Sequence, residues 1–184
     1  GDDWGLRASY KPNPAGPRHY TDRPVKKPGD WGHVKALDVT AGVYGRELHG
    51  LRLIRDALPE TLILSTIFSP LSIARTLSGD QALVRYLREN PEDLHRGLET
   101  IAEVTSYFAA VTLSAGADGV FFATQCATIE YLTVEEYEEF GRPYDLRVLD
   151  AASGGELRLL HIHGTGIMFD QLTDYPVEVI NWHD

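Results

Sequence analysis

The sequence has little cysteine, a deficit of positive charge and no long apolar run. Cys126 is the single cysteine, so no internal disulfide can form, which is typical of a protein from a reducing cytoplasm. The formal net charge of −10 argues against binding the phosphate backbone of a nucleic acid. No stretch approaches the ~18 consecutive apolar residues of a transmembrane helix, and the acidic start of the chain is unlike a secretory signal. We therefore expect a cytoplasmic protein with a small-molecule substrate, no nucleic-acid or membrane partner, and a homodimer as a possible assembly.

The length of 184 residues suits one domain with its own core, and we predict a single domain over residues 1–184. Residues 10–30 contain five of the ten prolines. Proline fixes φ and removes a backbone donor, so we predict an extended loop there, without helix or central strand. The basic side chains of this loop either face an anion or are simply solvated. They are Lys11, Arg18, Arg23, Lys26 and Lys27.

Helical and strand patterns alternate after this loop. Apolar spacings of three and four predict a helix over residues 47–58, and Asn90 followed by Pro91 predicts a long helix that ends near residue 115. A capping box, Thr133 with Glu136, predicts a further helical stretch up to the glycines at 154 and 155, and a short helix is expected at 168–172.

Short apolar runs between these helices predict buried strands, and the run at residues 61–68 is expected to be buried on both faces. Their alternation with helices predicts right-handed βαβ units and a parallel sheet. Four strands are half of an eight-stranded barrel, so the chain is either a small open sheet or a piece of a larger barrel. The strands are predicted at residues 61–67, 118–124, 156–162 and 177–181.

Two histidines, His161 and His163, end the strand predicted at 156–162. Alternate side chains on a strand share a face, so both imidazoles point the same way at the carboxyl end, where α/β folds bind ligands. The pair can bind a metal ion, handle protons near neutral pH, or fill the end of a buried strand. Zinc would need a third protein ligand, for which the candidates are His183, Asp184 and Cys126.

Other strand ends bring polar and aromatic residues to the same edge of the predicted sheet. An apolar floor of Phe68, Phe122 and Trp182 with polar groups around it would have the usual composition of a small-molecule pocket, although aromatics near strand ends can also simply cap the core. The candidate catalytic residues are His161, His163 and Gln125. The candidate substrate-binding residues are Phe68, Ser69, Phe122, Trp182 and Asp184.

Five segments resemble, in order, the uroporphyrinogen decarboxylase family: LILSTIFSPLSIARTLSG, SAGADGVFFATQ, EEYEEFGRPYDLRVL, LLHIHG and YPVEVINWHD, preceded by GDDWG. The resemblance implies a (β/α)8 TIM barrel, of which this chain is the central part, because whole members are much longer. One branch of the family decarboxylates the acetate side chains of uroporphyrinogen III, a tetrapyrrole, to give coproporphyrinogen III without metal or cofactor. Thr76 and Gln125 stand where that branch has a tyrosine and a serine.

A second branch, the corrinoid-dependent methyltransferases, binds zinc through a His-x-Cys pair and a later cysteine. His161 matches the histidine of that pair, and His163 replaces the cysteine. Metal-dependent amidohydrolases also use His-x-His, but on the first strand of their barrel. We predict a carboxy-lyase that acts on a tetrapyrrole or related carboxylated substrate with no metal and no cofactor. The alternatives are a thiol methyltransferase with zinc held by His161 and His163 and a corrinoid methyl donor, and a tetrapyrrole-binding protein without catalysis.

Overall fold

The computed structural model describes residues 1–9 and 19–183, and its centre is a parallel sheet. The sheet order is the chain order, and each strand pairs in parallel with the next. The α/β class and the parallel sheet are therefore as predicted, and the strand bounds differ from the prediction by at most three residues. The strands are β3 (Leu64–Phe68), β4 (Gly119–Thr124), β5 (Leu157–Ile162) and β6 (Val179–Trp182).

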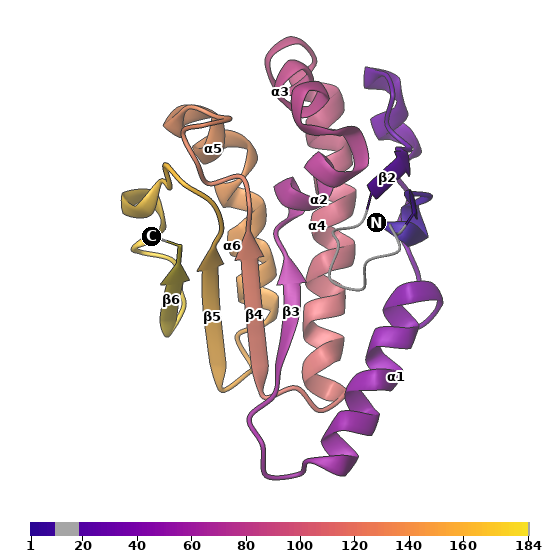
Figure 1. The fold of residues 1–184 in the computed structure, drawn as a ribbon, viewed down its shortest axis with the longest axis vertical. Coiled ribbons are helices and arrows are strands. Elements are labelled where there is room, and N and C mark those ends of the chain that lie inside the picture. Colours follow the sequence, from indigo (N-terminus) through magenta and orange to yellow (C-terminus); the bar gives the residue numbers. More distant parts are fainter. Residues whose placement is uncertain (10–18, 184) are drawn as a thin grey trace.

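Helices connect these strands and cover one face of the sheet. In Figure 1, α4 and α6 lie behind the sheet, while α2, α3 and α5 lie at the end to which the strand arrows point. The other face carries no helix among the described residues, and we call it the open face. The helices are α1 (Gly42–Ala57), α2 (Pro70–Ser78), α3 (Asp80–Glu89), α4 (Pro91–Ser114), α5 (Val134–Phe140), α6 (Arg142–Ala151) and the 3-10 helix η3 (Phe169–Leu172).

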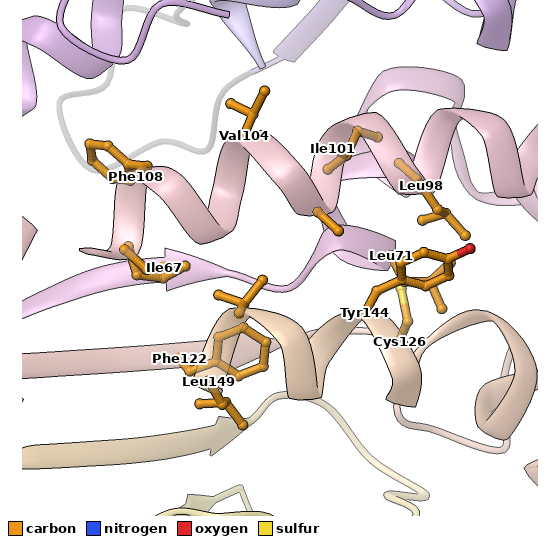
Figure 2. Close-up of a cluster of buried hydrophobic side chains, with 14 of the residues drawn as sticks. Ile67, Leu71, Leu98, Ile101, Val104, Phe108, Phe122, Cys126, Tyr144 and Leu149 are labelled. Atoms are coloured by element: carbon orange, nitrogen blue, oxygen red, sulfur yellow. The ribbon is translucent and has the colours of Figure 1, made fainter. Parts of the chain in front are cut away.

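The hydrophobic core lies between the sheet and α4 and α6. Figure 2 shows Ile67 and Phe122 from the strands together with Phe108 from α4 and Leu149 from α6, and all four side chains are buried. On β3, by contrast, Ile67 is the one buried residue and Phe68 is 46% exposed. The prediction that the run ending at Phe68 is buried on both faces is therefore wrong, because helices cover only one face.

A small antiparallel ribbon, β1 (Arg7–Ser9) with β2 (His19–Asp22), lies apart from the main sheet. Residues 10–18 of the predicted loop, including Lys11 and Arg18, lie outside the described residues. The remainder is not wholly extended loop, because β2 and the start of the 3-10 helix η2 (Pro28–His33) fall within it. Residues 19–22 contain no proline, and Pro28 occupies the first turn of η2, where its missing N–H costs little.

The basic residues of the described part of this loop have partners or are solvated. Arg23 donates to the carbonyl oxygens of Arg75 and Thr76, and Lys26 Nζ lies 2.7 Å from a carboxylate oxygen of Asp22. Lys27 is exposed. Arg23 therefore joins the N-terminal segment to α2, Lys26 makes an exposed ion pair within its own segment, and an anion-facing role has no support from these contacts.

The helix ends show which predictions local sequence could support. Thr133 and Glu136 form the predicted capping box, and α4 begins at Pro91 as predicted. Helices α2 and α3 were not predicted, and α1 begins five residues before the predicted start. Asp3 of the 3-10 helix η1 (Asp2–Trp4) accepts hydrogen bonds from the first-turn amides of α1, with Val43 N at 2.9 Å.

In the described part of the chain, no helix is long and apolar enough to cross a bilayer.

Candidate functional site

Three histidines converge at the carboxyl ends of β5 and β6. His161 is on β5, His163 follows it, and His183 follows β6. Each offers a ring nitrogen, and these nitrogens all lie within 4.8 Å of one another. The ring centroids are 5.9 Å apart for His161 and His163, 5.1 Å for His161 and His183, and 4.7 Å for His163 and His183. We call these residues the three-histidine cluster.

The strand register brings these rings together. His161 pairs with Asn181 of β6, and the backbone N–H of His163 donates to the carbonyl oxygen of Thr124 at 3.0 Å, which extends the alignment of β4 and β5. Side chains two residues apart on an extended strand share a face. The His163 side chain therefore lies on the same face as that of His161, and the His183 side chain on the same face as that of Asn181. The structure thus brings His161 and His163 together, and it adds His183 from the candidate third ligands.

Asn181 fixes the orientation of the His161 ring. Its Oδ1 lies 2.6 Å from His161 Nδ1. An amide oxygen only accepts, so Nδ1 carries the proton and the lone pair of the ring is on Nε2. The Phe121 ring stacks on the same imidazole, with centroids 5.2 Å apart and an interplanar angle of 28°. His161 is therefore held by a hydrogen bond and by a stacking contact.

The surroundings of His163 favour its neutral form. Partial burial lowers the pKa of His163, and the neighbouring His183, His161 and Arg75 lower it further, since they disfavour another positive charge. Neutral imidazole is the form that binds a metal ion. Two nitrogens each ~2.1 Å from one zinc ion are at most ~4.2 Å apart, so separations within 4.8 Å need only small side-chain adjustments. The donor set fits zinc.

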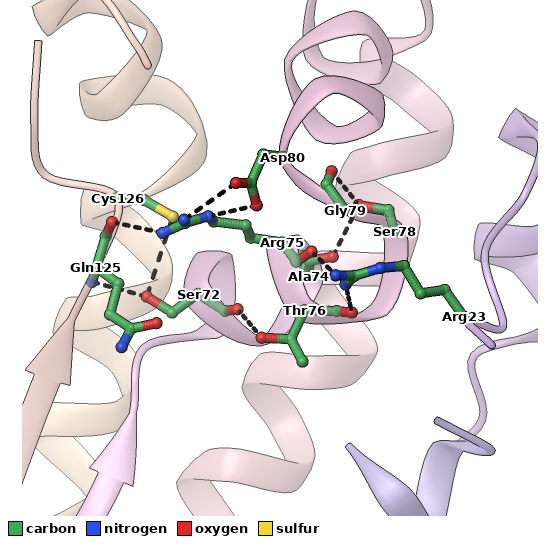
Figure 3. A network of polar contacts seen from close by, with 10 residues as sticks. All are labelled: Arg23, Ser72, Ala74, Arg75, Thr76, Ser78, Gly79, Asp80, Gln125 and Cys126. Atoms are coloured by element: carbon green, nitrogen blue, oxygen red, sulfur yellow. Dashed lines mark hydrogen bonds and ion pairs between the residues drawn. The ribbon is translucent and has the colours of Figure 1, made fainter. Parts of the chain in front are cut away.

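A cavity of about 250 Å³ adjoins His163, and we call it the His163 cavity. Figure 3 shows how Arg75 is held beside it: the guanidinium pairs with both carboxylate oxygens of Asp80 and donates to the Gln125 carbonyl oxygen at 3.2 Å. The guanidinium also lies 4.7 Å from the centre of the Tyr131 ring. The cavity is lined by Arg75, Gln125, Thr128, Glu130, Tyr131, His163, Gly164 and Thr165.

A second cavity, of about 190 Å³, lies beside Phe68 and is called the Phe68 cavity. Gln125 lines both cavities, and Thr76 lines this one. The two positions at which the chain departs from the decarboxylase pattern, Thr76 and Gln125, therefore share a cavity. Its described lining is Gly1, Leu6, Tyr20, Phe68, Ser72, Ile73, Thr76 and Gln125.

Three of the predicted pocket residues lie elsewhere. Phe122 is fully buried in the core on the helix side of the sheet, and Trp182 pairs with Ile162 on that side and contacts Phe169. Ser69 is buried, and its hydroxyl caps α2 by accepting from Ser72 N at 3.3 Å. The predicted floor of Phe68, Phe122 and Trp182 is therefore wrong, since only Phe68 faces the open side. Asp184 lies outside the described residues.

Cys126 does not meet the requirements of a metal ligand. It is buried on the core side, and burial raises the pKa of its thiol to about 12. Metal binding needs the thiolate, which this environment disfavours. The Ser72 hydroxyl is the hydrogen-bond partner of Sγ, at 4.0 Å.

Sequence reasoning missed Asn181, Phe121 and Arg75. The first two could have been found from the alternation of side chains, because the face that carries His161 must also carry Phe121 and Asn181 once the strands are aligned in parallel. Arg75 gave no such signal, because its approach to His163 depends on helix α2, which was not predicted.

The comparisons with known proteins agree on a family. The family model described as uroporphyrinogen decarboxylase (URO-D) matches residues 4–184. Two curated relatives, from Methanosarcina acetivorans and Methanosarcina mazei, are both named methylcobamide:CoM methyltransferase MtbA. They are 25% and 24% identical over 142 residues, which is 76% of this chain and 42% of each relative.

A solved structure, described as a methyltransferase from Methanosarcina mazei, has a similar fold. It aligns with a TM-score of 0.78 and 17% identity over 90% of this chain and 48% of that chain. The likeness confirms the predicted fold as part of a barrel of parallel βα units. The chain spans less than half the length of these proteins.

The names of the relatives overturn the predicted chemistry. Both curated relatives are methyltransferases, and their name includes a methylcobamide, which is a corrinoid. The prediction of a carboxy-lyase that decarboxylates a tetrapyrrole is therefore wrong, and so is the prediction that no cofactor takes part. The residue pattern had already departed from the decarboxylases at Thr76 and Gln125.

Proposed function

Because the chain belongs to the uroporphyrinogen decarboxylase family, we propose that its protein transfers a methyl group from a methylated corrinoid to a small thiol, with zinc held by His161 and His163. The observation that carries the proposal is the convergence of imidazoles at the ligand-binding edge of the sheet. The similarity to methylcobamide:CoM methyltransferases supplies the reaction class. The cytoplasmic location, the homodimer and the single domain stay predictions.

The zinc ion would supply Lewis acidity, which lowers the pKa of a thiol and favours its nucleophilic form. His161 is prepared for this ion by Asn181, which keeps Nε2 unprotonated. His163 is prepared by its lowered pKa. In the transfer a carbon–sulfur bond forms as the carbon–cobalt bond breaks, the electron pair of the broken bond stays with the corrinoid, and the thiol proton is released.

The two substrates are expected to approach from different sides. The His163 cavity, at about 250 Å³, is at the lower end of the ~300–1,000 Å³ of ordinary ligand pockets, which suits a small acceptor and is too small for a corrinoid. Gln125 and Arg75 line this cavity, and the Gln125 side chain makes no hydrogen bond within the described part of the chain. The corrinoid must therefore present its methyl group from the open face.

The test is a methyl-transfer assay on the full-length protein with methylcobalamin and CoM, the acceptor in the relatives' name. We expect methylated acceptor by mass spectrometry, a matching loss of methylcobalamin absorbance, loss of turnover after chelation, and recovery when zinc is added back. A zinc-loaded, folded protein that yields no methylated thiol would contradict the proposal.

A further inference from the structure

We infer that His183 is the third metal ligand and that Asn181 is a positioning residue, so that this chain supplies a metal site made only of imidazoles. The inference rests on the proposed function through the metal ion alone and not on the identity of either substrate. It departs from the resemblance described above at His163, which stands where that branch has the cysteine of its His-x-Cys pair.

His183 has the geometry of a ligand. Its ring is the nearer neighbour of both other rings in the cluster, at 5.1 Å from His161 and 4.7 Å from His163, and it meets them at steep angles of 63° and 83°. No hydrogen bond among the described residues occupies a ring nitrogen of His163 or His183, whereas His161 uses Nδ1 for Asn181. One ring nitrogen of each histidine lies within 4.8 Å of one in each of the other two, and the three residues come from the ends of two adjacent strands.

A sulfur ligand from this chain is excluded. Cys126 is the single cysteine of the sequence, and it is buried on the helix side of the sheet with its thiol protonated. His163 occupies the position of the cysteine in the His-x-Cys pair. Three protein ligands with a fourth position left open is the arrangement of catalytic zinc sites.

Asn181 acts on the metal through His161. The two residues are direct partners in the β5–β6 ladder, and their side chains lie on the same face with Nδ1 and Oδ1 2.6 Å apart. An outer hydrogen bond of this kind fixes the tautomer and the ring plane of a ligand histidine, and its loss typically costs ~10–100-fold in metal affinity. Asn181 is exposed, so its substitution should not disturb the core.

The chemical consequence concerns the charge of the site. Three neutral imidazoles leave the full charge of a divalent ion in place, whereas each thiolate ligand would cancel one unit. A thiol bound to the same ion would therefore meet a stronger Lewis acid than it would if one of these three ligands were a thiolate. The ligands that this chain supplies are therefore all neutral nitrogen donors.

The experiment measures metal binding by the full-length protein, without reference to turnover. Zinc content and zinc affinity are both measured by competition titration. The variants are His183→Ala, Asn181→Ala and Asn181→Asp, with His49→Ala on the exposed surface of α1 as the matched control. Circular dichroism confirms that each variant is folded.

We expect one zinc per protein molecule and a loss of affinity in His183→Ala that exceeds the ~10–100-fold loss in Asn181→Ala. Asn181→Asp should restore affinity, because a carboxylate also accepts from Nδ1–H, and His49→Ala should bind zinc normally. Undiminished affinity in His183→Ala would overturn the assignment of His183 as a ligand while leaving methyl transfer intact. A native protein that binds no metal would overturn the inference and the zinc component of the proposed function together.

Discussion

Phe121 and Phe122 are neighbours in sequence and lie on opposite faces of the sheet. Phe122 is fully buried against the helices, while the Phe121 ring stacks on His161 with the ring centroids 5.2 Å apart. The same residue type therefore serves the core at one position and the candidate site at the next. The sequence reasoning chose Phe122 for the site, and the register with β5 shows that Phe121 is the residue on the face of His161.

The two phenylalanines should separate stability from metal binding. We expect Phe122→Ala to lower the free energy of unfolding by about 3–5 kcal/mol, because it opens a cavity in the core. Phe121→Ala should cost much less stability and should weaken zinc binding, since it removes the stacking contact that holds His161. Urea denaturation and zinc titration of both variants give the comparison. If Phe121→Ala lowered the free energy of unfolding as much as Phe122→Ala, the Phe121 side chain would have to be buried in solution, which would contradict an open face.

A buried carboxyl group, Asp145 of α6, should govern the pH dependence of stability. Tyr137 and Tyr175 donate to its Oδ2 at 2.6 and 3.2 Å, Oδ1 has no partner among the described residues, and burial raises its pKa to about 7. Between about pH 4 and pH 7 the unfolded state has lost this proton and the folded state still binds it, so stability falls as the pH rises.

Asp145→Asn removes this titration. We expect the variant to be more stable than the native protein at pH 8, by on the order of a few kcal/mol, and the difference to shrink as the pH falls toward 4. Asp150→Asn, at an exposed position of the same helix, is the control and should leave the pH profile unchanged. Denaturation curves at several pH values decide the matter, and parallel profiles for native protein and Asp145→Asn would refute the assignment.

The thiol of Cys126 should be inert in the folded protein. Burial holds its pKa at about 12, so very little thiolate is present at pH 8, and the side chain is inaccessible. We expect no alkylation by iodoacetamide under native conditions and rapid alkylation in urea. Cys126→Ala should bind zinc normally. A native thiol that reacts at the rate of a free cysteine would contradict the burial seen here.

Local patterns in the sequence predicted the elements that depend on local chemistry. The strands were found because their apolar runs are short and bounded, and the capping box of Thr133 and Glu136 was found because both partners lie within one turn. The start of α1 was missed because its cap, Asp3, lies about 40 residues away along the chain. No local pattern contains a contact of that kind.

Only part of the candidate site could be predicted from the sequence, because the rest also depends on contacts between distant segments. His161 and His163 follow from alternation within one strand, but the partners of His161 belong to other strands, and their alignment requires the register. Asn181 and His183 face the site, while Trp182 between them faces the other side of the sheet. A change of one residue in the register would exchange these faces, so the register decides which residues belong to the site. The predicted reaction was wrong because the overall resemblance to the decarboxylases was given more weight than the two positions, Thr76 and Gln125, at which the sequence differs from them.

Gln125 should contribute to acceptor binding and not to metal binding. It lines both cavities beside the cluster, and only its backbone is engaged in hydrogen bonds within the described residues, through its carbonyl to Arg75 and its N–H to Ser72. Gln125→Leu keeps the approximate size and removes the amide. Loss of a hydrogen bond worth about 1–2 kcal/mol corresponds to a rise of roughly 5- to 30-fold in the KM for the thiol.

The control for this prediction is Gln81→Leu, the same change at an exposed position of α3 that lines neither cavity. Zinc content should be unchanged in both variants, and kcat should change little in either, because the amide contacts the acceptor in the ground state and the transition state alike. A Gln125→Leu variant with reduced kcat and native KM would instead place the amide at the reacting atoms. That result would move the acceptor from the His163 cavity toward the open face, where Phe121 and His161 lie.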